Sequence, residues 1–274
     1  MKHPRTIAIA LCILAASSAA RAQERFITLA STTSTEQSGL FDMLLPAFKS
    51  ATGINVRVVA VGTGQALAIG ARGDADALLV HDRTGEDKFI ADGHGLDRRD
   101  VMFNDFVLIG PKNDPAKIRG LKDAKQAFLL IAKSSSPFAS RGDDSGTHRM
   151  ELRFWKTAAV DLSGKPNWYR ELGQGMGPTL NTAAAMNAYV LADRATWANF
   201  KNRADLDILM QGDLALYNPY GSILVNPSKG AHIKAADAKI WHEWLTAAPG
   251  RATIASFKIN GEQLFFPLPE TPTN

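Results

Sequence analysis

Ser140-Arg141-Gly142-Asp143-Asp144-Ser145-Gly146-Thr147 is the stretch around which this sequence is organised. It opens a predicted helix, because apolar residues recur with helical spacing from His148 to Ala159. Either Asp144 or Ser145 is placed to cap that helix. A helix start offers free N–H groups and the positive end of the helix dipole, and the arginine adds a planar fork of charged donors. The stretch therefore predicts a grip for a compact anion.

The same stretch also has a plainer interpretation. Asp144 and Ser145 could simply cap a helix, while Arg141 pairs with Asp143 at the surface. Because helix caps of this kind are common, the stretch alone does not decide between the two. The choice depends on what the rest of the chain places near it.

The first 22 residues predict a signal peptide. A basic amino end precedes an apolar run from Ile7 to Ala16, and Ala20-Arg21-Ala22 fits the small-x-small pattern of a cleavage site. We expect cleavage after Ala22 and export to the periplasm. The apolar run is too short for a membrane-spanning helix, and no later stretch approaches the required length of about 18 apolar residues.

Charge and cysteine content exclude several classes of site. Cys12, the only cysteine, lies in the predicted signal peptide. The mature chain would then lack disulfides, thiolate metal sites and cysteine nucleophiles. Three of the cations behind the net charge of +4 are also in that segment, so the mature chain has a net charge near +1. No cluster of Lys and Arg indicates nucleic-acid binding, and selectivity for an anion must come from a local site.

The remaining sequence alternates between predicted strands and predicted helices, which indicates an α/β fold with a parallel sheet covered on both faces. The expected strands are residues 26–30, 54–61, 77–80, 105–110, 138–140, 168–172, 189–192, 206–210 and 221–225. The expected helices are residues 40–48, a short one ending at 71, then 85–92, 122–132, 148–159, 181–189 and 232–248. Pro46 is expected to kink or split the first of these helices.

This order of elements predicts two lobes. Residues 23–110 with 222–274 form lobe 1, residues 111–221 form lobe 2, and the turn-rich segment Pro111 to Pro115 is the expected first crossing between them. A cleft should lie at the carboxyl ends of the strands.

Three loops rich in donors occupy strand-to-helix turns and should meet across that cleft. They are the five hydroxyl residues from Ser31 to Thr35, the turn that contains Thr63, and the loop from Ser140 to Thr147. Hydroxyl, amide and guanidinium donors all suit an anion.

Two alternatives come from the same residues. Ser145, with His148 and either Asp143 or Asp144, supplies the residue types of a secreted serine hydrolase. Serine and histidine three positions apart at a helix start rarely reach that geometry, and no nucleophile-elbow pattern surrounds the serine. A metal site is not expected either, because the histidines show no ligand spacing.

At this point several blocks together resemble the tungstate-binding proteins of ABC importers, over nearly the whole mature chain. The blocks are Ala30-Ser31-Thr32-Thr33-Ser34-Thr35, Ala60-Val61-Gly62-Thr63-Gly64-Gln65, Asp76 to Asp82, Arg98 to Met102, Ser140 to His148, Gly173 to Gly177, Asn218 to Gly221 and Gly261 to Pro267. The resemblance implies a type II periplasmic-binding-protein fold, in which two lobes close on tungstate or molybdate and deliver it to a membrane permease. It implies a monomer without catalysis or cofactor.

The resemblance also implies which residues hold the ligand. The Thr-Thr-Thr-Ser motif of the family falls on Ser31-Thr32-Thr33-Ser34, with serine in the first place, and its ligand-clamping arginine matches Arg141. More distant phosphate-binding relatives share an Arg-Gly-Asp-x-Ser-Gly-Thr loop, which implies anion contacts from the loop here. The predicted ligand-binding residues are Ser31, Thr32, Thr33, Ser34, Thr63, Ser140, Arg141, Ser145, Gly146 and Thr147.

The ligand itself is left open between oxyanions. Tungstate and molybdate carry no proton near neutral pH, so their site should contain donors only. A phosphate- or sulfate-binding protein of the same fold is the alternative, and phosphate benefits from a carboxylate acceptor. We assign Asp143 to orienting Arg141 and Asp82 to capping a helix; a carboxylate directed at the ligand would favour phosphate.

Overall fold

The computed structural model describes residues 24–269, so the predicted signal peptide and Cys12 lie outside the described residues. The strands are β1 (Phe26–Thr32), β2 (Asn55–Val61), β3 (Ala77–Val80), β4 (Gly95–Pro111), β5 (Phe138–Ser140), β6 (Tyr169–Glu171), β7 (Val190–Asp193), β8 (Leu206–Met210), β9 (Tyr217–Val225), β10 (Lys258–Ile259), β11 (Glu262–Gln263) and β12 (Phe266–Pro267). The helices are α1 (Thr33–Gln37), α2 (Leu40–Thr52), α3 (Thr63–Arg72), α4 (Arg83–Ala91), α5 (Ala124–Ser134), α6 (Gly146–Thr157), α7 (Met176–Met186), α8 (Arg194–Asn199), α9 (Ala235–Thr246) and α10 (Ala248–Ser256).

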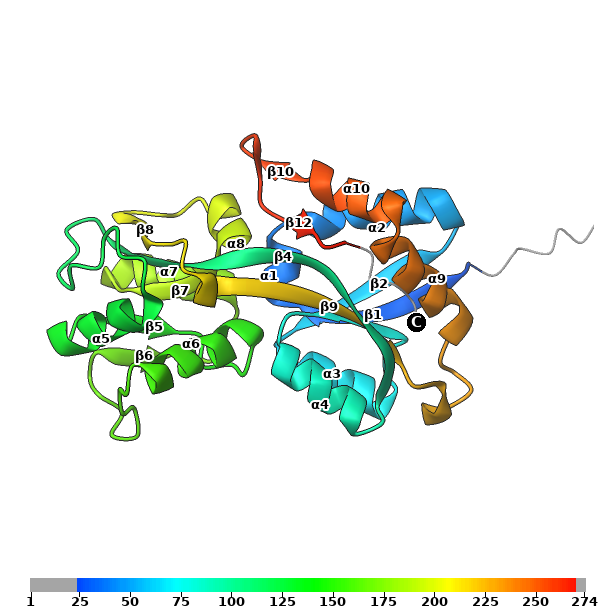
Figure 1. Ribbon diagram of the computed structural model, residues 1–274, viewed down its shortest axis with the longest axis horizontal. Coiled ribbons are helices and arrows are strands. Elements are labelled where there is room, and N and C mark those ends of the chain that lie inside the picture. Colours follow the sequence, from blue (N-terminus) through cyan, green and yellow to red (C-terminus); the bar gives the residue numbers. More distant parts are fainter. Residues whose placement is uncertain (1–23, 270–274) are drawn as a thin grey trace, which may run out of the picture.

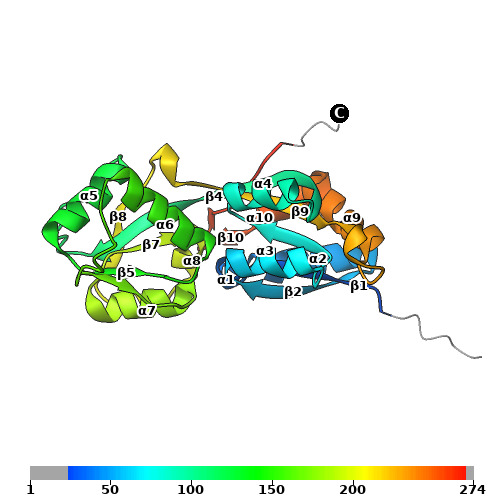
Figure 2. The same cartoon turned by 90° about the horizontal axis from the view of Figure 1, so that it is seen from below.

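The chain forms two α/β lobes that lie side by side and are joined by β4 and β9 (Figures 1 and 2). Lobe 1 contains β1 to β3 with α1 to α4 and the late helices α9 and α10, while lobe 2 contains α5 to α7 and β5 to β8. Helix α8 lies between the lobes, because Ala195 packs in the core of lobe 1 and Trp197 in that of lobe 2. The predicted α/β fold of two lobes is confirmed.

The sheet of lobe 1 is mixed rather than parallel, which corrects the sequence-based expectation. Its order is β2-β1-β3-β9-β4-β12. Strand β1 pairs in parallel with β2 and β3, whereas β9 is antiparallel to both β3 and β4. Strand β9 returns from lobe 2 and therefore enters the sheet against the direction of the first three strands.

The crossing between the lobes is made inside long strands. Strand β4 pairs with β9 from Gly95 to Asp105, and its later part pairs with β7 and β8. Met102 packs in the core of lobe 1, whereas Phe106 packs in that of lobe 2. The chain thus crosses near residues 103–105 and not at Pro111 to Pro115, which begins at the distal end of β4, where Lys112 N donates to Asp205 O at 3.0 Å. The predicted lobe limits at residues 110 and 221 fall within the two shared strands.

Two predicted helices differ from the observed ones. Helix α2 is not split at Pro46, which is exposed, while Leu44 and Phe48 stay fully buried. The single closing helix expected over residues 232–248 is instead two helices, α9 and α10. Ala247 between them is extended, with ψ of 173°, and Pro249 follows at the start of α10.

Aromatic rings pack against one another in the core of each lobe. In lobe 1 the rings of Phe48 and Trp241 meet edge to face at 5.0 Å, and in lobe 2 those of Phe128 and Trp155 do so at 4.5 Å. Such pairs contribute about 0.5–1.5 kcal/mol beyond their burial. Both tryptophans are buried core residues.

Candidate functional site

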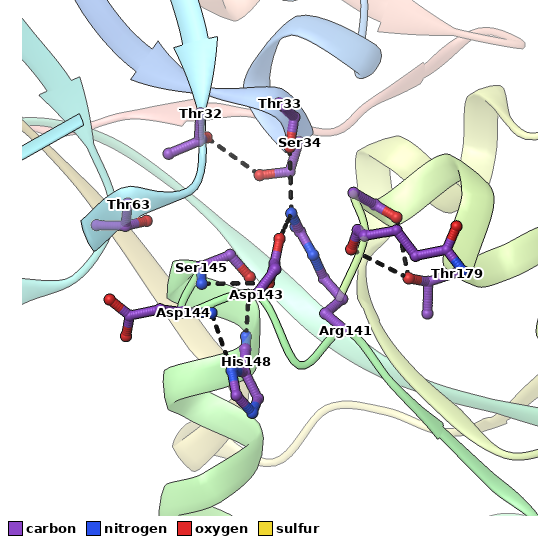
Figure 3. A network of polar contacts seen from close by, with 12 residues as sticks. Thr32, Thr33, Ser34, Thr63, Arg141, Asp143, Asp144, Ser145, His148 and Thr179 are labelled. Atoms are coloured by element: carbon purple, nitrogen blue, oxygen red, sulfur yellow. Dashed lines mark hydrogen bonds and ion pairs between the residues drawn. The ribbon is translucent and has the colours of Figure 1, made fainter. Parts of the chain in front are cut away.

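Arg141 lies between the lobes with 1% of its surface exposed. Its Nη2 donates to Asp143 Oδ2 at 2.6 Å and to Thr33 Oγ1 in lobe 1 at 3.1 Å (Figure 3). The predicted ion pair with Asp143 is present. The Nε and Nη1 atoms are buried and have no hydrogen-bond partner within residues 24–269. Buried charged donors are rarely left unpaired, so this guanidinium is arranged to meet a further acceptor.

The start of α6 supplies the next group of donors. Ser145 is the N-cap, as predicted, and its Oγ accepts from His148 N at 3.2 Å. Asp143 Oδ1 accepts from Ser145 N at 3.2 Å, so one carboxylate orders both the arginine and the helix start. Thr147 is fully buried, and its Oγ1 has no partner among the described residues. The start of α6 therefore holds a second buried polar group that, like Arg141, has unpaired atoms among the described residues.

The hydroxyl loop of lobe 1 lies opposite. Thr32 caps α1 by accepting from Thr35 N at 3.3 Å, and Ser34 Oγ lies 3.1 Å from Thr32 Oγ1. Figure 3 shows Thr33 in contact with the guanidinium of Arg141, whereas the hydroxyl of Ser34 is turned to Thr32. Ser31 differs, because its Oγ donates to Leu79 O at 2.6 Å within the sheet. Its hydroxyl hydrogen is therefore already engaged in this conformation.

Thr63, at the start of α3, joins the two lobes. Its Oγ1 accepts from Gly146 N at 2.8 Å, and Gly64 N donates to Asp144 O at 3.3 Å. Gly146 also lies against His81, where a Cβ atom would fall 2.9 Å from the ring. The loops of the two lobes are thus in direct contact, and the donors between them are shielded from solvent.

Ser140 takes a supporting position behind the loop. Its Oγ lies 3.0 Å from Tyr169 OH, and that phenol donates its hydrogen to Glu151 Oε1 at 2.7 Å. Trp155 Nε1 donates to that oxygen at 3.1 Å. Burial raises the pKa of Glu151 to about 8, although hydrogen bonds from Tyr169, Ser140 and Trp155 oppose the shift. The carboxyl is therefore mostly protonated at neutral pH.

This shift predicts how stability depends on pH. The unfolded carboxyl ionises near 4.5 and the folded one near 8, so this residue stabilises the folded state fully at low pH and loses that contribution as pH rises between the two values. Glu151→Gln should abolish the loss and raise the free energy of unfolding by at least about 1 kcal/mol at pH 8, with a smaller difference at pH 5. Urea unfolding of both proteins at the two pH values measures this. An equal difference at both would contradict it.

His81 was missed by the sequence analysis as a site residue. It is 4% exposed, with Nε2 at 3.1 Å from Ser34 Oγ and Nδ1 at 3.0 Å from Asn218 Oδ1. Its position directly after β3, at the same sheet edge as the hydroxyl loop, was the available signal. The start of α7 was missed too: Gly177 N donates to Gln37 Oε1 of lobe 1 at 3.0 Å.

Asp82 does not face the anion grip. It precedes α4, as predicted, but its side chain makes no capping hydrogen bond. Its carboxylate instead accepts from Arg149 Nη1 at 2.7 Å and Arg153 Nη1 at 3.1 Å, both on α6 of lobe 2. Because Asp143 is likewise held by Arg141, neither carboxylate offers the acceptor that would favour phosphate.

The residues of the hydrolase alternative are close together but not arranged as a triad. Ser145 Oγ accepts from the backbone of His148, while the ring Nδ1 of His148 accepts from Asp144 N at 3.1 Å. The serine hydroxyl thus has no imidazole base. Over residues 24–269 there is also no group of three or more His, Cys, Asp or Glu side chains suited to a metal ion. In the same range, no helix has both the length and the apolar character to cross a bilayer.

Known proteins share this architecture. Residues 16–249 match the PBP superfamily domain. The tungstate-binding protein TupA of Peptoclostridium acidaminophilum is 46% identical over 245 residues, which are 88% of this chain and 85% of that protein.

Solved structures agree. The structure titled as the tungstate ABC transporter from Geobacter sulfurreducens has 49% identity and a TM-score of 0.78, over 85% of this chain and 99% of the other. TupA from Desulfovibrio alaskensis has 41% identity and a TM-score of 0.76, over 90% and 100%. The resemblance found in the sequence is confirmed, and the chain is a substrate-binding protein rather than an enzyme. It belongs to the PBP superfamily and, within it, to the family of tungstate-binding proteins of ABC transporters.

Proposed function

We propose that this protein captures tungstate in the periplasm as a monomer without a cofactor, and delivers it to an ABC permease in the inner membrane. The observation that carries the proposal is Arg141, a buried guanidinium with two unpaired donors between the lobes. Opposite it lie the hydroxyl loop and Thr63 of lobe 1. The contacts to the anion would come from Thr32, Thr33, Ser34, Thr63, Arg141, Ser145, Gly146 and Thr147, with Ser31 and Ser140 behind them.

The chemistry of the donor set supports a fully deprotonated oxyanion. The guanidinium, the hydroxyls and the helix-start amides donate without needing to titrate. The two nearby carboxylates, Asp82 and Asp143, are both occupied by arginines. Tungstate and molybdate share charge and tetrahedral shape, so we propose that molybdate also binds. Phosphate, which keeps a proton for part of the time at neutral pH, should bind less well.

Calorimetric titration of the mature protein tests this proposal. Tungstate and molybdate should each bind with a stoichiometry of about one, and sulfate and phosphate should bind more weakly. A response to phosphate alone would replace the proposal with the phosphate-binding alternative. No heat and no thermal stabilisation with any of these anions would reject an oxyanion-binding role.

The ion pairs of Asp82 should act as a latch that holds the lobes closed. The carboxylate is 2% exposed and belongs to lobe 1, whereas its partners Arg149 and Arg153 belong to lobe 2. Opening the lobes must separate these charges. These ion pairs stabilise the closed state without contacting the ligand. They should therefore lower the dissociation rate of the ligand more than they raise its association rate.

Asp82→Asn should therefore increase the dissociation rate of tungstate by roughly tenfold, because one partner of a buried ion pair is lost. The association rate should change little. Stopped-flow tryptophan fluorescence measures both rates. Asp87→Asn is the matched control, since it removes an exposed pair with Arg83 on the same helix, at 2.7 Å. An unchanged dissociation rate in Asp82→Asn would show that the latch does not hold the closed state.

A further inference from the structure

A chain of buried polar side chains runs from Asp193, at the end of β7 in lobe 2, to the hydroxyl loop of lobe 1. Asp193 Oδ1 accepts from Thr196 N at 2.8 Å and from Asn104 Nδ2 at 3.5 Å. Asn104 Oδ1 accepts from Asn218 Nδ2 at 2.6 Å. The carboxylate end thus orients both amides, because an acceptor can face only a donor. Asn218 must therefore present its oxygen, and not its nitrogen, to His81.

This orientation fixes the tautomer of His81. Nδ1 lies 3.0 Å from Asn218 Oδ1 and must carry a hydrogen to donate to it. In a neutral ring Nε2 is then a bare acceptor, and its neighbour at 3.1 Å is Ser34 Oγ. The hydroxyl hydrogen of Ser34 is therefore drawn towards the histidine.

The direction of this bond propagates through the hydroxyl loop. Since Ser34 has only one hydroxyl hydrogen, its contact with Thr32 Oγ1 at 3.1 Å must be donated by the threonine. Thr32 in turn accepts from Thr35 Oγ1 at 2.7 Å. With a neutral His81, the hydrogens of these hydroxyls follow one another towards the ring. Ser34 then offers a lone pair, and not its hydrogen, to an anion beside Arg141, which is the wrong polarity for an anion without a proton.

We propose that His81 takes up one proton from solvent when the dianion binds, and that this proton frees the hydroxyl hydrogen of Ser34. Nε2–H then donates to Ser34 Oγ, so Ser34 is free to donate its own hydrogen to the anion. The step forms one N–H bond on His81 and breaks the bond to hydrogen in the hydronium ion or buffer acid that supplies the proton, while the Ser34 hydroxyl only rotates. The inference rests on the proposed function, because a bound dianion must be present near Ser34.

The charges around His81 are consistent with uptake only in the complex. Burial, with smaller contributions from the charges of Arg141 and Arg153, lowers the pKa of His81 to about 4 in the free protein. The hydrogen bond to Asn218 and the charge of Asp82 oppose this shift.

Within residues 24–269, the other side chains that pack on the ring are aromatic. On β9, Tyr220 stacks on the ring at 4.8 Å, and on β4 the apolar Phe106 lies 6.3 Å away. Asp193 at the far end of the polar chain has a raised pKa because it is buried. A dianion beside the ring supplies the missing negative charge and favours the imidazolium.

Calorimetry in buffers of different ionisation heat counts the protons directly. Dilute tungstate is titrated at pH 7 in PIPES, which ionises with little heat, and in imidazole, which ionises with much more. The difference between the binding enthalpies in the two buffers should correspond to uptake of about one proton per anion at this pH or slightly below it. Affinity should fall by about tenfold per pH unit up to the pKa that His81 has in the complex, and then level off.

His81→Gln separates this role from a structural one. A glutamine amide can donate to Ser34 without titrating, so tungstate should still bind, and proton uptake should fall to about zero. His242→Gln is the matched control. That histidine is also fully buried, pairs with a serine hydroxyl, Ser222 Oγ at 2.8 Å, and has a pKa lowered to about 4 by burial. Its replacement should leave the uptake unchanged.

The outcomes separate the inferred proton uptake by His81 from the proposed binding of tungstate. Tungstate binding by the unaltered protein without proton uptake would overturn the inference and leave the proposed function standing. Equal uptake in His81→Gln would also overturn it, since the proton would then reside elsewhere. If the variant fails to fold, nitrogen NMR of the unaltered protein decides, because Nε2 of His81 must become protonated when tungstate binds. Binding of no anion at all would reject both.

Discussion

Arg141→Ala should weaken tungstate binding by at least about 2 kcal/mol, which is roughly thirtyfold in Kd. The side chain is almost completely buried, and it contributes two charged donors that have no partner within the described part of the chain. Its removal also leaves the carboxylate of Asp143 without its ion pair at 2.6 Å. Calorimetric titration with tungstate measures the loss.

Two further variants show whether that loss of affinity comes from the charge and shape of the Arg141 guanidinium. Arg141→Lys keeps the charge but not the planar fork, so it should recover only part of the affinity. Arg119→Ala removes the same charge from an exposed pair with Asp207 in lobe 2 and should bind normally. If Arg141→Ala bound tungstate like the unaltered protein, the arginine would serve the fold alone.

Gly146→Ala should weaken binding by at least about tenfold, because it obstructs closure of the lobes. An alanine Cβ at this position would lie 2.9 Å from His81 Cε1 and 3.0 Å from Thr63 Oγ1, both in the opposite lobe. The backbone itself accepts an alanine, since residue 146 is the first of a regular helix. The lobes should therefore stay folded while the closed state becomes harder to reach.

Tungstate titration and thermal unfolding together test this prediction. The melting temperature without ligand should stay close to that of the unaltered protein, and its rise on adding tungstate should shrink. Gly164→Ala is the matched control, because a Cβ there would meet nothing within 4 Å. Undiminished affinity in Gly146→Ala would mean that the ligand-bound lobes do not approach each other as they do in this structure.

The sequence was enough to predict contacts between residues that are close together in the chain. Ser145 caps α6 and Asp143 pairs with Arg141 two residues away, so local pattern was enough. Donor-rich turns after strands also met across the lobes, as strand order required. The motif could not predict that the Ser31 hydroxyl would donate its hydrogen to the Leu79 carbonyl within the sheet.

Long-range pairing explains the features that were missed. The early part of β4 carries charged residues that do not resemble a buried strand, yet Arg98 is held at 2.7 Å by Glu86 of α4. This ion pair explains how a charged segment can form part of a strand, and it is within this strand that the chain crosses between the lobes. The role of His81 depends likewise on Asn218, which lies 137 positions away. No local period in the sequence encodes such contacts.

The most direct test of the account is a crystal structure of the protein with tungstate, with the metal located by its anomalous X-ray scattering. The account predicts one strong tungsten peak between the lobes, with anion oxygens within hydrogen-bond distance of Arg141, Thr147 and Ser34. The guanidinium atoms Nε and Nη1 and the hydroxyl of Thr147, unpaired within residues 24–269, should then have acceptors. A tungsten peak elsewhere, or an anion held without Arg141, would contradict it.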